Sequence, residues 1–394
     1  MGIDSPALVV LHGGDGEGPA ERTMAHARAA AARISIRAAR EAGFETVIVA
    51  TDSPGAFADV TGVIVDPDAE GEPFELHRRL REVVGRFGLE RPAVMGAGAV
   101  PLLGVGEFQF VVEQLRLHDE RFVTNNFFSG DITGWTPGRA LERLGKFERD
   151  NQIPRRLRDE GELVPVILPR TTGTQFDLDT PADLCVLAFH EGLDPELRAA
   201  MQGLELPLQS YYEVMQVFCD RKAELIVAGR VGSQAWHHLE RETACRVRLI
   251  SEERGMAAAD DGHRPRSIAG FMIEDVGPER FFARMAEMGD ALVLDTRVVE
   301  AHLGLEPTRE DRFQSDLATG ATRPGPGAAR DHGRCGGGAI AGAAGRAFAR
   351  VRWADGAERC GVAGERPAAG VATLRRSCWS GWLSRRCGHR WVSA

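Results

Sequence analysis

The sequence predicts an α/β protein built on a mostly parallel sheet with helices on both faces, joined to a second, smaller α/β domain. Short apolar runs alternate with longer helical patterns through residues 7–190, and the alternation starts again near residue 224. The chain has 394 residues, which is enough for two or three domains with cores of their own. Because strands that alternate with helices pair through crossovers, the sheet should be mainly parallel.

The first part of the chain contains predicted strands and helices in strict order. Residues 7–12 form an apolar run that ends in glycines, and an Ala- and Arg-rich helix follows over residues 21–42. Further strands are predicted at 46–51, 62–65, 93–96 and 164–168, with helices at 74–87, 108–117, 140–158 and 181–190. Residues 121–135 are predicted to be extended.

The second part repeats the pattern on a smaller scale. Residues 193–222 are predicted to be a helical connector. Strands are then expected at 224–228, 245–250 and 291–294, and helices at 233–242, 279–288 and 298–303. The predicted organisation is a first domain over 1–192, the connector, a small α/β domain of unknown role over 223–317, and a tail over 318–394.

The tail differs from the rest of the chain in composition. Its apolar periodicity stops near residue 318, and it holds four of the six tryptophans and a glycine run at Gly336–Gly338. In a GC-rich gene a shifted reading frame yields Arg, Gly, Ala, Cys and Trp codons and few stops. We therefore predict a frameshifted or disordered tail, and a basic interaction arm is the alternative. Sequencing of the locus separates the two.

Charge and cysteine content indicate a compartment and exclude some partners. Residues 1–320 carry a net charge of −18 and the remainder +9, so the body should repel nucleic acid. Cys185, Cys219 and Cys245 are scattered, which is typical of buried thiols in a reduced cytoplasm. No run approaches the roughly 18 apolar residues of a membrane span. We expect a cytoplasmic protein without a membrane or nucleic-acid partner, and the oligomeric state stays open.

Two glycine-rich loops follow predicted strands, at the edge where open parallel sheets bind ligands. In the first, Gly13, Gly14 and Gly16 let backbone N–H groups approach phosphate oxygens, with Arg22 as a fixed cation. A simple tight turn is the alternative. In the second, Gly96 and Gly98 leave room for a sugar or a base, or make a close-packed turn.

Polar side chains gather in two further segments. Asn125, Asn126, Ser129 and Asp131 interrupt an apolar stretch, where they contact either a ligand or the backbone. In FDLDTPADL, residues 176–184, strand geometry would point Asp177 and Asp179 to the same side, where both could bind Mg²⁺. Thr180, Pro181 and Asp183 are also a common helix start, which leaves Asp177 unexplained.

The order of the GG-x-G loop, the Arg-bearing helix, the G-x-x-P-L-L segment and FDLDTPADL resembles the GT-A-type nucleotidyltransferases over about residues 5–192. The likeness is nearest to 2-phospho-L-lactate guanylyltransferase and the molybdenum cofactor guanylyltransferases. It implies Mg²⁺-dependent transfer of a nucleoside monophosphate from an NTP to a small phosphorylated or acidic acceptor, with release of pyrophosphate.

The resemblance also implies roles for particular residues. Catalytic roles fall to Arg22, Asp177 and Asp179, and metal binding to Asp177 and Asp179. Asp131 is a further candidate ligand that would replace the acid which the family has before its P-L-L segment. The nucleotide would be bound by the residues of the two glycine loops and of the polar segment, namely Gly13, Gly14, Gly16, Gly96, Gly98, Asn125, Asn126 and Ser129.

The sequence departs from the family's pattern at two points. Residues 97–100 read Ala-Gly-Ala-Val where the family has an acid before its P-L-L segment, and neither Lys146 nor Lys222 lies in the first loop. The alternative function is therefore a catalytically degenerate regulatory protein that binds a nucleotide or a sugar phosphate.

Overall fold

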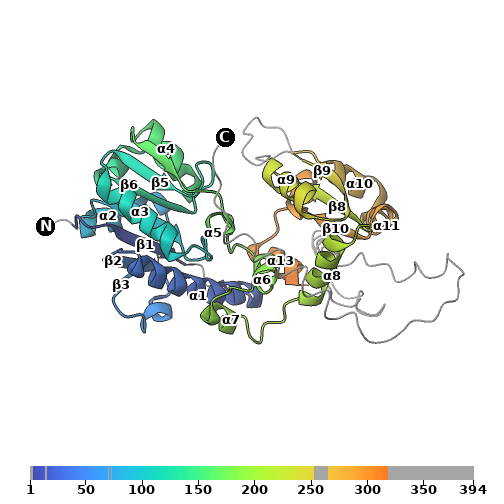
Figure 1. The fold of residues 1–394 in the computed structure, drawn as a ribbon, viewed down its shortest axis with the longest axis horizontal. Helices are drawn as coiled ribbons and strands as arrows, with labels where there is room; N and C mark the ends of the chain where they lie inside the picture. Colours follow the sequence, from blue (N-terminus) through green and yellow to red (C-terminus); the bar gives the residue numbers. More distant parts are fainter. Residues whose placement is uncertain (1–2, 14–15, 70, 72, 253–264, 318–394) are drawn as a thin grey trace, which may run out of the picture. The chain divides into compact units, whose positions relative to one another are not determined.

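The computed structural model describes residues 3–13, 16–69, 71, 73–252 and 265–317. The predicted tail and Gly14 lie outside these residues. The described residues divide into two compact units, one made of residues up to 183 with 193–204 and one of residues 184–192 with those between 205 and 317. Figure 1 labels most of the elements of each unit.

The first unit is built on a seven-stranded sheet of order β3-β2-β1-β4-β6-β5-β7. All neighbouring strands pair in parallel except β6, which is antiparallel to β4 and to β5. This confirms the predicted fold class. The strands are β1 (Ala7–His12), β2 (Thr46–Thr51), β3 (Ile64–Pro67), β4 (Pro92–Gly96), β5 (Arg121–Thr124), β6 (Ile132–Thr136) and β7 (Val164–Ile167).

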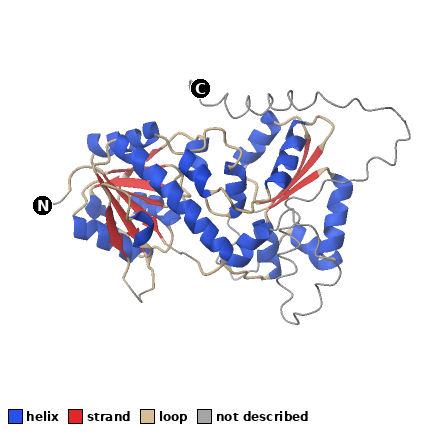
Figure 2. Ribbon diagram, turned by 90° about the horizontal axis from the view of Figure 1, so that it is seen from below, coloured by secondary structure: helices blue, strands red, loops and turns tan. Residues whose placement is uncertain are grey.

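Helices cover both faces of this sheet (Figure 2). Alternate residues of β1 point to opposite sides: Leu8 and Val10 join the core that includes Ile36 of α1, whereas Val9 packs with Leu80 of α2. The helices of this unit are α1 (Pro19–Glu41), α2 (Leu76–Phe87), α3 (Val105–Leu117), α4 (Ile153–Asp159), α5 (Thr172–Gln175) and α7 (Pro195–Ala200), with 3₁₀ turns at Pro54–Phe57, Gly138–Arg143 and Asp150–Gln152. Helix α6 (Pro181–Leu187) begins at the end of this unit's first segment.

Two predictions about local structure need correction. The helix expected over 140–158 is broken into two 3₁₀ turns and the short α4, since Gly145 interrupts the pattern and Pro154 supplies no N–H within a longer helix. The extended segment 121–135 is two antiparallel strands joined by a loop over 125–131.

Strand direction brings the predicted loops to one edge of the sheet. The loops after β1, β4 and β7 all leave the carboxyl ends of parallel strands. Because β6 runs in the opposite direction, its first residue lies at the same edge as the last residue of β5. The candidate ligand-binding residues therefore share one edge.

Strand β7 is the last strand at one side of the sheet. Val164 is 59% exposed and Ile167 is 42% exposed. The backbone N–H groups of Val164 and Leu168 donate to the carbonyl oxygens of Glu120, just before β5, and of Thr124, its last residue, at 3.0 and 2.9 Å.

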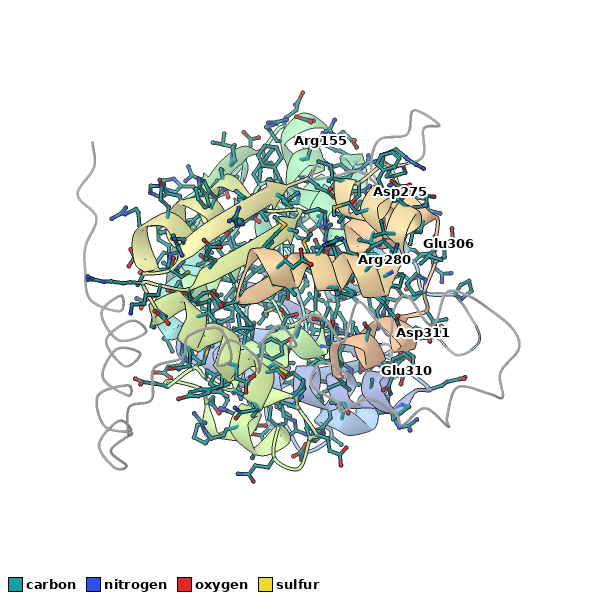
Figure 3. The ribbon with its side chains drawn as sticks, turned by 90° about the vertical axis from the view of Figure 1, so that its right-hand side faces the viewer. Arg155, Asp275, Arg280, Glu306, Glu310 and Asp311 are labelled. Atoms are coloured by element: carbon teal, nitrogen blue, oxygen red, sulfur yellow. The ribbon has the colours of Figure 1, made fainter. Side chains whose placement is uncertain are left out.

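The second unit has a three-stranded parallel sheet of order β10-β8-β9. Its strands are β8 (Glu224–Gly229), β9 (Arg246–Ser251) and β10 (Ala291–Leu294); its helices are α8 (Leu208–Cys219), α9 (Ser233–Glu242), α10 (Ile268–Val276), α11 (Pro278–Met288), α12 (Thr296–Leu303) and α13 (Arg309–Leu317). Asp275, Arg280 and Asp311 are exposed on its outer helices (Figure 3). None of the helices in the described ranges is long and apolar enough to cross a membrane.

Candidate active site

The acid-bearing segment 176–179 lies against the loop that follows β4. It is not a strand but a connection between α5 and α6. The N–H of Leu178 donates to the Gly98 carbonyl at 3.0 Å, and the Leu178 side chain is fully buried. This anchor holds Asp177 and Asp179 beside the carboxyl end of β4.

Arg28 of α1 fastens the same segment from the other side. Its Nε donates to the carbonyl of Leu178 at 3.0 Å, and an Nη donates to the carbonyl of Asp179 at 2.5 Å. Two backbone carbonyls in sequence are thus fixed by one guanidinium group.

Gly98 is required by this packing. A Cβ at this position would come within 2.8 Å of the Leu178 carbonyl oxygen and 3.0 Å of Arg28 Cγ. Leu178 and Arg28 therefore fill the space beside Gly98. This arrangement agrees with the alternative prediction of a close-packed turn, and it does not support room for a sugar or a base beside Gly98. A Cβ at Gly96 would meet only the Ala99 side chain, at 3.8 Å.

Three predicted acids and two others share this neighbourhood. Burial, followed by the charges of Asp179 and Asp131, raises the pKa of Asp177 to about 8. Burial, together with the charges of Asp150 and Asp179, raises the pKa of Asp131 to about 6. Loss of hydration and the charge of Asp179 also raise the pKa of Asp150. The structure therefore gathers Asp131, Asp177 and Asp179, whose negative charges repel one another.

Asp183 lies near these acids and also in the first turn of α6. Its Oδ2 accepts from the N–H groups of Asp179 and Thr180, at 3.0 and 2.7 Å, at the beginning of α6. Burial, with the Asp179 charge, raises the pKa of Asp183 to about 6. The predicted helix start at Thr180, Pro181 and Asp183 is confirmed.

Asn125 is a positioning residue for Asp131. Its side chain is 0% exposed, and its Nδ2 donates to Asp131 Oδ2 at 2.7 Å and to the Thr174 carbonyl at 2.8 Å. Its Oδ1 accepts from the backbone N–H groups of Asp131 and Ile132. Each polar atom of the amide group is used within the protein, so the backbone alternative describes Asn125 better than ligand contact does.

Asn126 and Ser129 lie nearer to solvent in the same loop. The Asn126 Oδ1 accepts from the N–H of Phe128 at 3.1 Å, and the Ser129 hydroxyl donates to Asn151 Oδ1 at 3.1 Å. Both side chains are half-buried, so the loop presents them at the edge of the sheet.

The first glycine loop reaches the same edge at β1. Gly13 is exposed, and a Cβ there would lie 3.2 Å from Asp52 Oδ2. Gly16 lies beside Glu21, whose Oε2 accepts from the Gly18 N–H at 3.4 Å at the start of α1. Arg22 is exposed and donates to the Glu17 carbonyl.

The carboxylate oxygens of Asp131, Asp177 and Asp179 are suitable ligands for a hard divalent cation, but their arrangement in the structure is not that of a metal site. Within the described part of the chain, no three His, Cys, Asp or Glu side chains are arranged to hold a metal ion. Carboxylate oxygens are nevertheless the ligands that Mg²⁺ prefers. Burial first, and neighbouring acids second, raise the pKa values of Asp131 and Asp177, and a bound cation would favour the ionised forms. The chemistry of these donors therefore suits such an ion, although the side chains as placed do not converge on one point.

Comparison with known proteins gives weak structural likenesses. No protein-family model matches the sequence, and no curated protein matches it. A putative nucleotide-diphospho-sugar transferase from Desulfovibrio desulfuricans has a TM-score of 0.39 and 15% identity, over 50% of this chain and 94% of that one. A cytidylyltransferase from Leptospira borgpetersenii has a TM-score of 0.38 and 17% identity, over 50% and 94%.

A Mycobacterium tuberculosis protein whose structure is a complex with manganese has a TM-score of 0.30 and 15% identity, over 46% of this chain and 95% of that one. At TM-scores this low, the chemistry of the site rests on its own residues.

Sequence reasoning missed three features of this edge. Arg28 is one of several arginines in α1, and only its contacts distinguish it. Val100, fully buried, has a φ of +40°, a strained backbone for a β-branched residue. Phe128 is 81% exposed at the tip of the β5–β6 loop, where a single apolar residue gives no pattern.

Replacement of Gly98 tests the packing of the acid-bearing segment. We expect Gly98→Ala to lower the free energy of unfolding by about 1–3 kcal/mol, because the Cβ collides with backbone that must then move. Gly96→Ala is the matched control and should cost less than about 1 kcal/mol. Equal losses in chemical unfolding would contradict this account of Gly98.

Proposed function

We propose that this chain is a divalent-metal-dependent nucleotidyltransferase that transfers an NMP from an NTP to a small phosphorylated or acidic acceptor. The observation that carries the proposal is the group of mutually repelling carboxylates Asp131, Asp177 and Asp179 at the carboxyl edge of a mostly parallel sheet. Asp131 and Asp177 are half-buried and Asp179 is exposed, and neighbouring carboxyl groups with raised pKa values are typical of functional sites.

In the proposed reaction an anionic oxygen of the acceptor attacks the α-phosphorus of the NTP. A new phosphorus–oxygen bond forms, the bond from the α-phosphorus to the bridging oxygen breaks, and pyrophosphate leaves with that electron pair. An anionic acceptor oxygen has no proton to remove, so the protein's work is positioning and charge neutralisation. A bound Mg²⁺ would supply positive charge against the phosphate oxygens.

The chain's own residues divide this work along the edge. The N–H groups around Gly13 and Gly16, with Arg22, would bind the triphosphate. Asp177 and Asp179, with Asp131, would hold the cation. Asn126 and Ser129 would contact the nucleotide at the edge of the β5–β6 loop, and the loop with Gly96 would lie beside it.

A second candidate is a regulatory protein that binds a nucleotide or sugar phosphate without turnover. One observation favours it: residues 97–100 carry no acid, and Gly98 could not carry one, since its Cβ would collide with Leu178. Release of pyrophosphate separates the two candidates, because only the transferase produces it.

Thermal unfolding of the full chain tests nucleotide binding. Each NTP is added with and without Mg²⁺, and a ligand at 100 times its Kd should stabilise the protein by about 2.7 kcal/mol. We expect one NTP to give a Mg²⁺-dependent shift that the Asp177→Asn, Asp179→Asn double variant loses. An Asp59→Asn, Asp119→Asn double variant removes two exposed acids of the same unit and should keep the shift.

The result tests metal binding and nucleotide binding separately. A shift that persists in the Asp177, Asp179 variant would contradict their role in metal binding. The absence of a shift with every NTP would contradict nucleotide binding altogether.

A further inference from the structure

We infer that Arg28 is the positioning residue of the cation site, and that it joins the phosphate-binding helix to the acid-bearing segment. The inference rests on the proposed function and goes beyond it, because no step of that function uses Arg28. It follows from the contacts of one side chain.

Arg28 acts on the segment through its backbone. Its guanidinium donates to the carbonyls of Leu178 and Asp179, at 3.0 and 2.5 Å. Its aliphatic stem passes the backbone of Gly98, where an added Cβ would lie 3.0 Å from Cγ and 3.3 Å from Cδ. Gly98 in turn accepts from the Leu178 N–H. Leu178 is therefore held by both of its backbone polar groups, and the carboxylates on either side of it have a defined place.

The same helix begins at the first glycine loop. Helix α1 starts at Pro19, beside the loop expected to bind phosphate, and Arg28 lies further along it. One rigid element thus sets the distance between the phosphate-binding loop and the acids. Loss of Arg28 should free the acids and leave the start of the helix intact.

The test compares Arg28→Ala with Arg40→Ala in the full-length protein. Arg40 is on the same helix and also donates to a backbone carbonyl, that of Thr61 at 2.8 Å, so the control loses a similar bond elsewhere. Hydrogen exchange of the peptide containing the Leu178 amide is measured without any ligand. We expect exchange there to be at least about tenfold faster in Arg28→Ala and unchanged in Arg40→Ala.

A second measurement follows binding of Mn²⁺ alone, by its electron paramagnetic resonance signal. We expect Arg28→Ala to weaken Mn²⁺ binding by about tenfold or more, with metal-free NTP affinity within about twofold of the unaltered protein. Arg28→Lys should be intermediate, because an ammonium group cannot reproduce the two-pronged contact. A merely structural role predicts equal losses of both ligands and a lowered unfolding temperature.

Each of the two measurements can contradict the inference by itself. Unchanged exchange at Leu178 in Arg28→Ala overturns the positioning role of Arg28, whatever binds. Normal Mn²⁺ affinity in that variant also overturns it. If the unaltered protein binds neither Mn²⁺ nor any NTP, the proposed function fails, and the exchange experiment still decides whether Arg28 holds the segment.

Discussion

Asp177→Asn should make the protein more stable at pH 8, by about 2–3 kcal/mol. Burial and the charges of Asp179 and Asp131 raise the pKa of Asp177 to about 8, whereas an unfolded chain has an aspartate pKa of about 3.9. Each tenfold change in proton affinity is worth about 1.4 kcal/mol, and the half-buried position of Asp177 reduces the full difference. Asn resembles the protonated acid and keeps an oxygen for the Leu178 N–H.

The pH dependence has a definite sign. Between about pH 4 and pH 8 the folded protein retains a proton on Asp177 that the unfolded chain has lost. This contribution to stability is complete below pH 4 and disappears as the pH rises through 8. Asp131 and Asp183, each with a pKa raised to about 6, add the same trend up to that pH.

Urea unfolding at several pH values measures this effect. The unaltered protein and Asp177→Asn should be similar near pH 4 and diverge as the pH rises. Asp59→Asn is the control. Because Arg33 lowers the pKa of Asp59, removal of the Asp59 carboxylate should not increase the stability of the protein at pH 8. Parallel pH curves for Asp177→Asn and the unaltered protein would show that Asp177 is not under this repulsion.

Asn125→Ala should destabilise the protein by about 2–4 kcal/mol. The change leaves the N–H groups of Asp131 and Ile132 without their acceptor beside the buried Asn125 position, whereas the Thr174 carbonyl keeps its bond from Gln175 Nε2. Each buried polar group without a partner costs about 1–3 kcal/mol, and some relaxation reduces the total. Chemical unfolding at pH 7 measures the loss.

Asn126→Ala is the neighbouring control. It removes a single bond to the N–H of Phe128, which lies near solvent, so the loss should stay below about 1 kcal/mol. If Asn125→Ala were as mild as Asn126→Ala, the amide network would not hold the β5–β6 loop.

The fold was predictable because its elements have strong local patterns. Residues 7–12, 46–51 and 233–242 occur as predicted, since apolar spacing alone identifies such elements. The broken helix over 140–158 was not predictable from spacing, because short 3₁₀ turns carry little periodicity. The reversed direction of β6 was also hidden, since an extended run has the same pattern in either direction.

The sequence identified the acids of the candidate site but not the residues that pack against them. Asp131, Asp177 and Asp179 stand out as acids in or beside apolar stretches, and the structure places them in one neighbourhood. Whether Gly98 leaves room for a ligand or for Leu178 depends on a contact across eighty residues, which no local pattern reports. The same holds for Arg28, whose partners lie 150 residues away.

Strand β7, at the edge of the seven-stranded sheet, contains a residue that disfavours pairing with a further strand. Successive residues of a strand direct their backbone N–H groups to opposite sides. Because Val164 and Leu168 donate toward β5, the backbone nitrogen of Pro165 lies on the side of β7 that pairs with no other described strand. Proline has no N–H, so an incoming strand would find a gap in the row of donors. An edge strand with exposed apolar residues such as Val164 and Ile167 can pair with an edge strand of another chain and so aggregate. Pro165 makes such edge-to-edge pairing unfavourable.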